Sequence, residues 1–215
     1  MSAMPGRFLV MEGIDGCGKT TQLQRLLEWL PTSGLLPTGA QVLQTREPGG
    51  TPLGQALREL LLHPPDAAAP GPVAELLLYA ADRAQHVDRM IRPALERGDW
   101  VLSDRFAGST LAYQGYGRQL DRELILTLER IATGGLQPDA TFWFNLPLEV
   151  SLARREHQAN DRIEAAGQAF LQRVCDGFAH LAASRDWWEV DARCSQDAVS
   201  EQIRVRLQHA FGGAD

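Results

Sequence analysis

A glycine-rich segment near the N-terminus limits the folds open to this chain more than any other stretch. Residues 13–20 read Gly-Ile-Asp-Gly-Cys-Gly-Lys-Thr, which fits the pattern G-x-x-x-x-G-K-[ST]. The segment follows a short apolar run at 8–11 and opens a helical pattern at 19–30. In that context backbone N–H groups and the helix dipole hold phosphate oxygens, while Lys19 adds a cation and Thr20 a hydroxyl for Mg²⁺. We therefore predict a phosphate-binding loop; a chance match in a glycine-rich turn is the alternative.

Apolar runs alternate with helical patterns along the rest of the chain. Breakers at 46–50 and four prolines between 64 and 72 separate these patterns, and a helix is predicted from there towards Arg97, where Gly98 stops it. Such alternation indicates right-handed crossovers and a parallel sheet covered on both faces, with ligands at the carboxyl ends of its strands. We predict one three-layer α/β domain over residues 1–215. The predicted strands are 8–11, 41–45, 100–104, 140–146 and 187–190.

Composition excludes several classes of protein. With 215 residues, 44% of them hydrophobic and 22% charged, the chain has the size and make-up of one globular domain. Its apolar runs are too short to span a bilayer, and the N-terminus lacks a secretory signal, so we expect a cytoplasmic protein without a membrane partner. A formal charge of −6 argues against nucleic acid as a partner. The three cysteines lack paired metal or disulfide spacings, which predicts reduced thiols.

Charged residues at the ends of two predicted strands suggest a second anion site. Asp104 ends the third strand and is placed to reach Mg²⁺ through water, unless it is only an acidic helix cap. Arg105 follows it, and Arg46 occupies the equivalent place after the second strand. Each arginine alone could form a surface ion pair, but together they offer two planar forks to a phosphate.

Two adjacent phosphate sites favour phosphoryl transfer between nucleotides over hydrolysis. Phosphates repel strongly at short range, so the cations of Lys19, Arg46, Arg105 and Mg²⁺ offset that repulsion. A monophosphate acceptor has a second pKa near 6, is largely ionised at pH 7 and needs no general base. Two alternatives stay open: a kinase for another small acceptor, nucleotide or nucleoside, and a nucleotide-dependent binding switch with little turnover.

Six motifs occur in order along the chain: Glu12-Gly-Ile-Asp-Gly-Cys-Gly-Lys-Thr-Thr21, Thr45-Arg-Glu-Pro-Gly-Gly-Thr51, Tyr79-Ala-Ala-Asp-Arg-Ala-Gln85, Asp104-Arg-Phe106, Ser109-Thr-Leu-Ala-Tyr-Gln114 and Asp161-Arg-Ile-Glu164. With these motifs the chain resembles, over nearly its whole length, the bacterial thymidylate (dTMP) kinases, a family of P-loop nucleoside monophosphate kinases. The resemblance implies a P-loop NTPase fold with a short lid, ATP and dTMP as substrates, Mg²⁺ as cofactor and a homodimer.

The resemblance also implies a set of site residues. The implied ATP-binding residues are Gly13, Ile14, Asp15, Gly16, Cys17, Gly18, Lys19, Thr20, Thr21, Arg154 and Asp191. The implied dTMP-binding residues are Asp15, Arg46, Tyr79, Arg83, Arg105, Ser109, Thr110, Tyr113 and Gln114. The expected catalytic residues are Lys19, Arg105, Asp15, Arg154 and Arg155, and the expected metal residues are Thr20 and Asp104.

Some of these roles have a simpler reading. The family stacks an aromatic residue on thymine at the position of Tyr79, where phenylalanine is usual, and binds the base through the residue matching Arg83. Tyr113 matches the tyrosine that favours deoxyribose, and Asp15 the carboxylate that contacts the sugar or metal-bound water. An amphipathic helix would equally account for Tyr79 and Arg83, and a dipole-favoured acid for Asp15. Cys17 at a helix N-terminus could have a lowered pKa, although a small space-filling residue is the simpler interpretation.

A polar stretch near residues 154–164 resembles the lid that closes over ATP in this family. Lids exclude water and bring arginines to the transferring phosphoryl group. Arg154 and Arg155 are the candidates here, and which of them acts stays open because the stretch is shorter and less arginine-rich than in the family. An exposed, charged helix end is the alternative interpretation.

Overall fold

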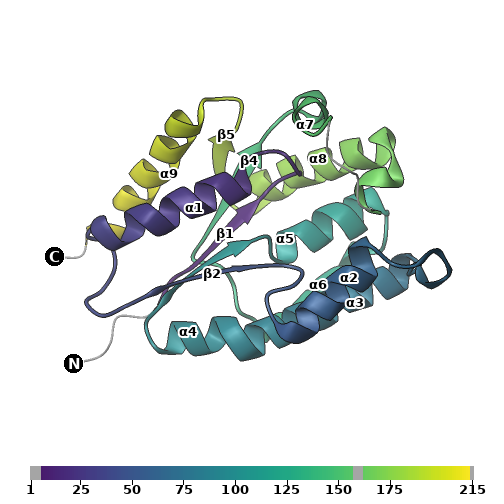
Figure 1. The fold of residues 1–215 in the computed structure, drawn as a ribbon, viewed down its shortest axis with the longest axis horizontal. Coiled ribbons are helices and arrows are strands. Elements are labelled where there is room, and N and C mark those ends of the chain that lie inside the picture. The colour runs from purple at the N-terminus through teal and green to yellow at the C-terminus, as the bar shows by residue number, and fades with distance from the viewer. Residues whose placement is uncertain (1–5, 157–161, 214–215) are drawn as a thin grey trace.

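Five parallel strands form the centre of the molecule (Figure 1). The computed structural model describes residues 6–156 and 162–213. The strands are hydrogen-bonded in the order β2-β3-β1-β4-β5, which confirms the predicted parallel sheet, and each strand begins and ends within one residue of the predicted position. They are β1 (Phe8–Glu12), β2 (Val42–Arg46), β3 (Trp100–Asp104), β4 (Ala140–Asn145) and β5 (Trp188–Asp191).

The central strand β1 shows why its sequence is apolar without alternation. All five of its residues are buried, because helices cover both faces of the sheet. Phe8 and Val10 pack into a cluster with Phe106, and the rings of Phe8 and Phe106 meet edge to face at 4.9 Å. Leu9 and Met11 point into the larger cluster on the opposite face. The two faces together give the three layers that the sequence predicts.

The helices lie on either side of this sheet (Figure 1). The predicted helix towards Arg97 is one continuous rod, in which a π-helical turn joins two α-helical parts, and Gly98 follows it with a φ of 86°. None of the helices in residues 6–156 and 162–213 has the length and apolarity needed to cross a bilayer. The helices are α1 (Lys19–Trp29), α2 (Pro52–Leu62), α3 (Pro72–His86), η3 (Val87–Ile91), α4 (Arg92–Glu96), α5 (Ala107–Thr110), η4 (Leu111–Gly117), α6 (Arg122–Thr133), α7 (Leu148–Arg154), α8 (Gln168–Ser184) and α9 (Gln196–Phe211), with short 3₁₀ turns η1 (Leu30–Thr32), η2 (Asp66–Ala68) and η5 (Glu164–Ala166).

Candidate active site

The glycine-rich loop joins the end of β1 to the start of α1, as its motif predicts. Gly18 precedes the helix with a φ of 96°, a left-handed conformation that glycine adopts without strain. A side chain at Gly13 would stand 2.9 Å from the carbonyl oxygen of Phe144, so the loop passes too close to β4 for any larger residue. The buried Lys19 ammonium donates to the carbonyl oxygens of Gly13 and Ile14, both at 3.0 Å. The side chain of Lys19 therefore folds back against the glycine-rich loop.

The structure brings the two predicted metal residues together. The Thr20 hydroxyl donates to Asp104 Oδ2 across 3.3 Å. Asp104 Oδ1 is buried, and it has no hydrogen-bond partner within the described part of the chain. Residues 6–156 and 162–213 contain no cluster of three or more histidine, cysteine or acidic side chains that could hold a metal. One carboxylate and one hydroxyl suit Mg²⁺, which takes its remaining ligands from substrate phosphates and water.

Arg105 is held against the phosphate loop by several contacts. Its backbone has a φ of 71°, and its N–H donates to Met11 O at 2.9 Å. Its guanidinium donates to Asp15 Oδ1 at 2.6 Å and to Gly13 O at 2.9 Å. The Tyr113 hydroxyl donates to the other oxygen of Asp15 at 3.2 Å. Burial alone would raise the pKa of Asp15, but the charges of Arg105 and Lys19 outweigh it and hold that pKa well below its usual range.

The buried carboxylate of Glu12 fixes the turn after β3. Its Oε1 accepts from the backbone N–H groups of Phe106 and Ser109, both at 3.0 Å, and its Oε2 accepts from the Ser109 hydroxyl at 2.6 Å. Burial raises the pKa of Glu12, and these hydrogen bonds and the charge of Arg105 act against that rise. Glu12 could not be assigned this role from the sequence, because nothing in the sequence shows which N–H groups an acid at the end of a buried strand accepts from.

A cavity that opens to solvent lies beside Arg105, and most of the residues predicted to bind the acceptor line it. Of the nine residues predicted to bind dTMP, all but Arg46 line it. The remaining lining residues have no role predicted from the sequence. The complete lining is Asp15, Glu47, Pro48, Arg58, Leu62, Tyr79, Arg83, Arg105, Phe106, Ser109, Thr110, Tyr113, Gln114 and Ile163.

Arg58 brings a cation into this cavity that the motifs did not indicate. It donates to the carbonyl oxygen of Pro48 at 3.1 Å, and its Cδ packs against Gly49. Arg46 has an exposed side chain near the same glycine and does not line the cavity, so its contact with the acceptor phosphate stays a prediction. In the sequence Arg58 is one polar position of an amphipathic helix, which does not distinguish it from a solvated arginine.

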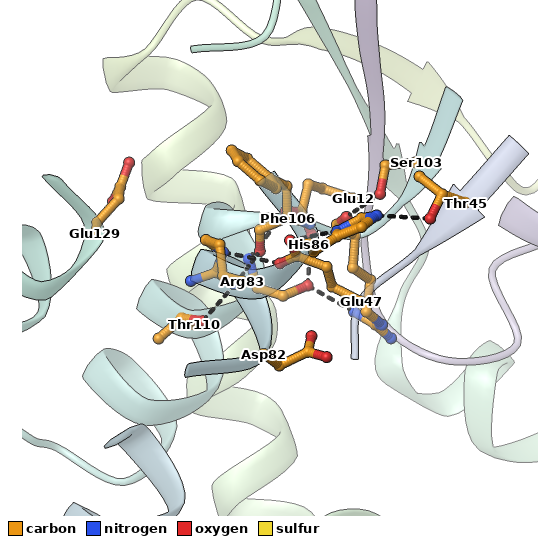
Figure 2. Close-up of polar contacts among 12 residues, drawn as sticks. Glu12, Thr45, Glu47, Asp82, Arg83, His86, Ser103, Phe106, Thr110 and Glu129 are labelled. Carbon is orange, nitrogen blue, oxygen red and sulfur yellow. Dashed lines mark hydrogen bonds and ion pairs between the residues drawn. The ribbon is translucent and has the colours of Figure 1, made fainter. Parts of the chain in front are cut away.

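Arg83 enters the cavity from α3 and is fixed by a buried polar network (Figure 2). Its Nε donates to Glu47 Oε2 at 2.8 Å, and its Nη2 donates to the Thr110 hydroxyl at 2.9 Å. Glu47 Oε1 contacts His86 Nδ1 at 2.9 Å, and His86 Nε2 contacts the Thr45 hydroxyl at 2.6 Å. The network ties the end of β2 to α3, so the orientation of Arg83 depends on both elements.

The predicted ATP-side residues lie around the other side of the phosphate loop. Arg154 donates to Gly16 O at 3.2 Å and to Ala192 O at 2.9 Å, which joins the loop to the segment after β5. The buried Arg155 packs its aliphatic stem against Gly16. Asp191 accepts from the backbone and side chain of Arg193, and these hydrogen bonds hold its pKa below the usual range. Of the predicted lid, residues 157–161 lie outside the described ranges.

Cys17 does not have the lowered pKa considered from its position. Burial raises the pKa of its thiol, and the nearby charges of Lys19 and Arg105 only partly oppose that rise. The side chain is 3% exposed, with Lys19 Nζ 3.6 Å from the sulfur. The simpler interpretation, a small residue that fills space in the loop, therefore agrees with the structure.

A phosphate loop at the end of the central strand, with an arginine-lined cavity beside it, defines a P-loop phosphotransferase. A family model described as thymidylate kinase matches residues 11–203. A thymidylate kinase of Synechococcus sp. (strain WH7803) is 70% identical over 205 residues, which cover 95% of this chain and 96% of the relative. A thymidylate kinase of Prochlorococcus marinus (strain MIT 9313) is 65% identical over 209 residues, 97% of each chain. The chain belongs to the thymidylate kinase family.

Proposed function

We propose that this enzyme transfers the γ-phosphoryl group of ATP to dTMP, giving ADP and dTDP. An oxygen of the dTMP phosphate attacks the γ-phosphorus, the bond from that phosphorus to the β–γ bridging oxygen breaks, and ADP leaves with the electron pair. The observation that carries the proposal is the pairing of Arg105 with Asp15, which joins the phosphate loop to the acceptor cavity. Membership of the thymidylate kinase family supports the choice of substrates.

The charged groups divide between the two nucleotides. Lys19 and the loop N–H groups hold the phosphates of ATP, and Arg105 faces the acceptor phosphate. Arg58 and Arg46 add positive charge from the side of α2 and β2, where Arg58 lines the cavity. Tyr79, Arg83 and Gln114 line the same cavity and are assigned to the base, and Tyr113 is assigned to the sugar. No side chain is needed as a general base, because the monophosphate is largely ionised at pH 7.

Mg²⁺ is the proposed cofactor, held by Thr20 and Asp104 together with phosphate oxygens of ATP. When bound, it neutralises charge on the β- and γ-phosphates during transfer. The buried Asp104 Oδ1, which lacks a partner in the described ranges, supports this assignment. Family members in general use ATP with a metal ion, so the choice of Mg²⁺ over another divalent cation is part of the proposal.

An acceptor panel tests the reaction directly. ADP release is measured with ATP and Mg²⁺ and with dTMP, dUMP, dCMP, dGMP, UMP or thymidine as acceptor. We expect a strong preference for dTMP. Turnover with another acceptor would keep phosphoryl transfer and discard the base assignments, and ATP binding without turnover on any acceptor would favour a nucleotide-dependent switch.

Two neighbouring arginines in and after α7 are proposed to act on the ATP phosphates. Arg154 and Arg155 both touch the phosphate loop at Gly16, the first through its carbonyl oxygen and the second by packing. We expect Arg155→Ala to lower kcat by roughly tenfold or more and Arg154→Ala to raise the KM for ATP. Steady-state kinetics with varied ATP separate the two effects. Full kcat in both variants would remove these arginines from the mechanism.

We also propose that two copies of the chain form a homodimer through α2, α3 and α6. Each of these helices carries large apolar side chains that are exposed and spaced to lie on one side of the helix. The helices pack side by side, as Figure 1 shows for α2, α3 and α6. Exposed apolar side chains on three helices that pack together are typical of a protein–protein interface. The residues are Leu53, Leu60, Val73, Leu77, Leu124 and Ile131.

A further inference from the structure

A buried glutamate behind the acceptor cavity makes contacts that the proposed reaction does not by itself require. Glu75, in the first turn of α3, is 0% exposed. Its Oε1 accepts from the Gln114 side-chain amide, Nε2, at 2.7 Å. Its Oε2 pairs with Arg118 Nη2 at 3.2 Å and with Arg162 Nη2. A fully buried acid is uncommon unless it is paired, and here two arginines supply the pairing.

The chemistry of this carboxylate fixes the orientation of the Gln114 amide. Paired with two guanidinium groups, Glu75 acts as a carboxylate, which only accepts hydrogen bonds. The branch of the Gln114 amide that faces Glu75 must therefore be its NH₂ group. The other branch, the oxygen Oε1, accepts no hydrogen bond within the described ranges, and Gln114 lines the acceptor cavity. Without Glu75, a side-chain amide could turn over and present its NH₂ group instead.

The geometry points to Glu75 as a specificity-determining positioning residue, which holds the Gln114 oxygen toward an N–H donor on the acceptor base. The inference rests on the proposed function. Thymine and uracil carry a donor N–H at ring position 3, between two carbonyl groups. Cytosine carries an acceptor nitrogen at that position, which would meet the Gln114 oxygen without a proton between them. A site built around one hydrogen-bond polarity rejects the opposite polarity strongly, because buried polar groups are left unpaired.

The first test replaces the carboxylate by a group that can also donate. Glu75→Gln allows its new NH₂ group to donate to Gln114 Oε1, so the Gln114 amide is free to turn. We expect the ratio of kcat/KM for dTMP to kcat/KM for dCMP to fall by about tenfold or more. The change should lie mainly in the KM for the acceptor, with the KM for ATP within about twofold of its original value.

A matched substitution elsewhere controls for the loss of a buried, arginine-paired carboxylate. Glu129 is also buried and pairs with Arg185 at 3.6 Å, and it lies outside the acceptor cavity and apart from the polar network of Arg83 (Figure 2). Glu129→Gln should leave the ratio of kcat/KM for dTMP to kcat/KM for dCMP unchanged. If it lowers the ratio as much as Glu75→Gln does, the effect is one of general packing and the inference is overturned.

Two further variants keep the test decisive if Glu75→Gln does not fold. Glu75→Asp keeps a negative charge for Arg118 and Arg162 but draws the oxygen back from Gln114 by one methylene, so the ratio should again fall. Gln114→Leu removes the amide, and adding a Glu75 substitution to it should then change the ratio no further. An additional fall in the double variant would show that Glu75 does not act through Gln114.

The outcomes separate this inference from the proposed function. If the native enzyme turns over none of the acceptors, the proposed function fails. If the native enzyme selects dTMP and both Glu75 variants select it equally well, only the positioning role of Glu75 fails. Binding constants for dTMP and dCMP, measured by calorimetry without ATP, should show the same change in ratio as the kinetics.

Discussion

Asp15 places a negative charge inside a loop that binds anions, and its partners account for this. The carboxylate accepts hydrogen bonds from Arg105 and Tyr113. Its negative charge therefore positions a cation and a hydroxyl beside the acceptor cavity. In the folded state the low pKa of Asp15 keeps it ionised throughout the neutral range. These contacts support the proposed role of Asp15 on the acceptor side of the site.

Replacing this charge should affect one substrate more than the other. Asp15→Asn keeps an oxygen for Arg105 but removes the charge-assisted bond, so we expect kcat/KM for dTMP to fall roughly tenfold or more. The KM for ATP should stay within about twofold. Initial rates with each substrate varied in turn give both numbers. Unaltered kinetics for dTMP would contradict the role given to Asp15.

The three cysteines should differ in reactivity. The thiolate is the reactive form, and burial raises the pKa of Cys17 and raises that of Cys175 to about 11. Cys194 is exposed. In the native protein at pH 8, iodoacetamide should label Cys194 at least about tenfold faster than the other two. Peptide mass spectrometry over time measures this, with unfolded protein as the control in which all three react alike. Labelling of Cys17 as fast as Cys194 would contradict the buried environment described for it.

At the scale of elements, Asp82 links α3 to the turn that follows β2. Its Oδ1 accepts from the Gly49 N–H at 3.2 Å, while its buried Oδ2 has no partner within the described ranges. Burial raises the pKa of Asp82 from 3.8 to about 6, and the charge of Glu47 adds to the rise. The folded state thus binds the carboxyl proton of Asp82 more tightly than the unfolded state does. The stability that this contributes is complete below about pH 3.8 and is lost as the pH rises through about 6.

An uncharged side chain at this position should remove that pH dependence. Asp82→Asn keeps the oxygen that accepts from Gly49 and cannot ionise. A rise in pKa from 3.8 to about 6 corresponds to roughly 3 kcal/mol in total, of which about 1.4 kcal/mol falls between pH 5 and pH 8. The free energy of unfolding of the variant, relative to the original protein, should rise by that amount over this range in urea melts.

The control for this prediction is an exposed acid close by in the chain. Asp88 lies in η3 with its side chain 72% exposed, so Asp88→Asn should show no such trend with pH. If the free energies of unfolding of Asp82→Asn and the original protein differ by the same amount at every pH in this range, Asp82 is ionised in the folded state throughout.

The sequence predicted those elements whose patterns are local. The strands were found because unbroken apolar runs bounded by breakers are typical of strands buried on both faces. The segments α5, η4 and α6 were not assigned from the sequence. In η4 the backbone forms a π-helix over Leu111–Gly117, which shifts side chains away from the 3.6-residue period on which helix prediction depends.

The candidate site divides in the same way. Lys19 and Arg105 were identified because each lies in a short motif of neighbouring residues directly after a strand, and such a motif can be recognised from the sequence alone. Glu75, Arg58 and His86 were not, because their partners come from distant segments. An acid in the first turn of a helix, as Glu75 is, ordinarily indicates a solvated group favoured by the dipole. Only the folded chain places it at 0% exposure beside the acceptor cavity.

At the scale of the whole molecule, the proposed homodimer would bury the exposed side of α3, whose other residues line the acceptor cavity. In a symmetric dimer the same residue of both copies lies in the interface, so one substitution buries a charge in each copy. Leu77 is 51% exposed on α3, and we expect Leu77→Glu to convert a dimer into monomers at micromolar concentration. Size-exclusion chromatography with light scattering gives the mass of each species.

A second exposed apolar residue provides the matched control. Val205 on α9 is also 51% exposed but lies outside α2, α3 and α6, so Val205→Glu should leave the dimer intact. If the original protein is a monomer, or if Val205→Glu dissociates it and Leu77→Glu does not, the interface is elsewhere or absent.

The separation of the acceptor cavity from most of the phosphate loop has a pharmacological consequence. The cavity takes its walls from α2, α3, the turn after β2, the segment after β3 and Ile163, and of the loop residues only Asp15 reaches it. If the cavity binds the nucleoside monophosphate as proposed, a small molecule that fills it would compete with that substrate and leave the proposed ATP side of the loop free. Its potency would then not fall at high cellular ATP, and the inhibitor would be ranked by the hydrogen-bond polarity and size of its base-like ring.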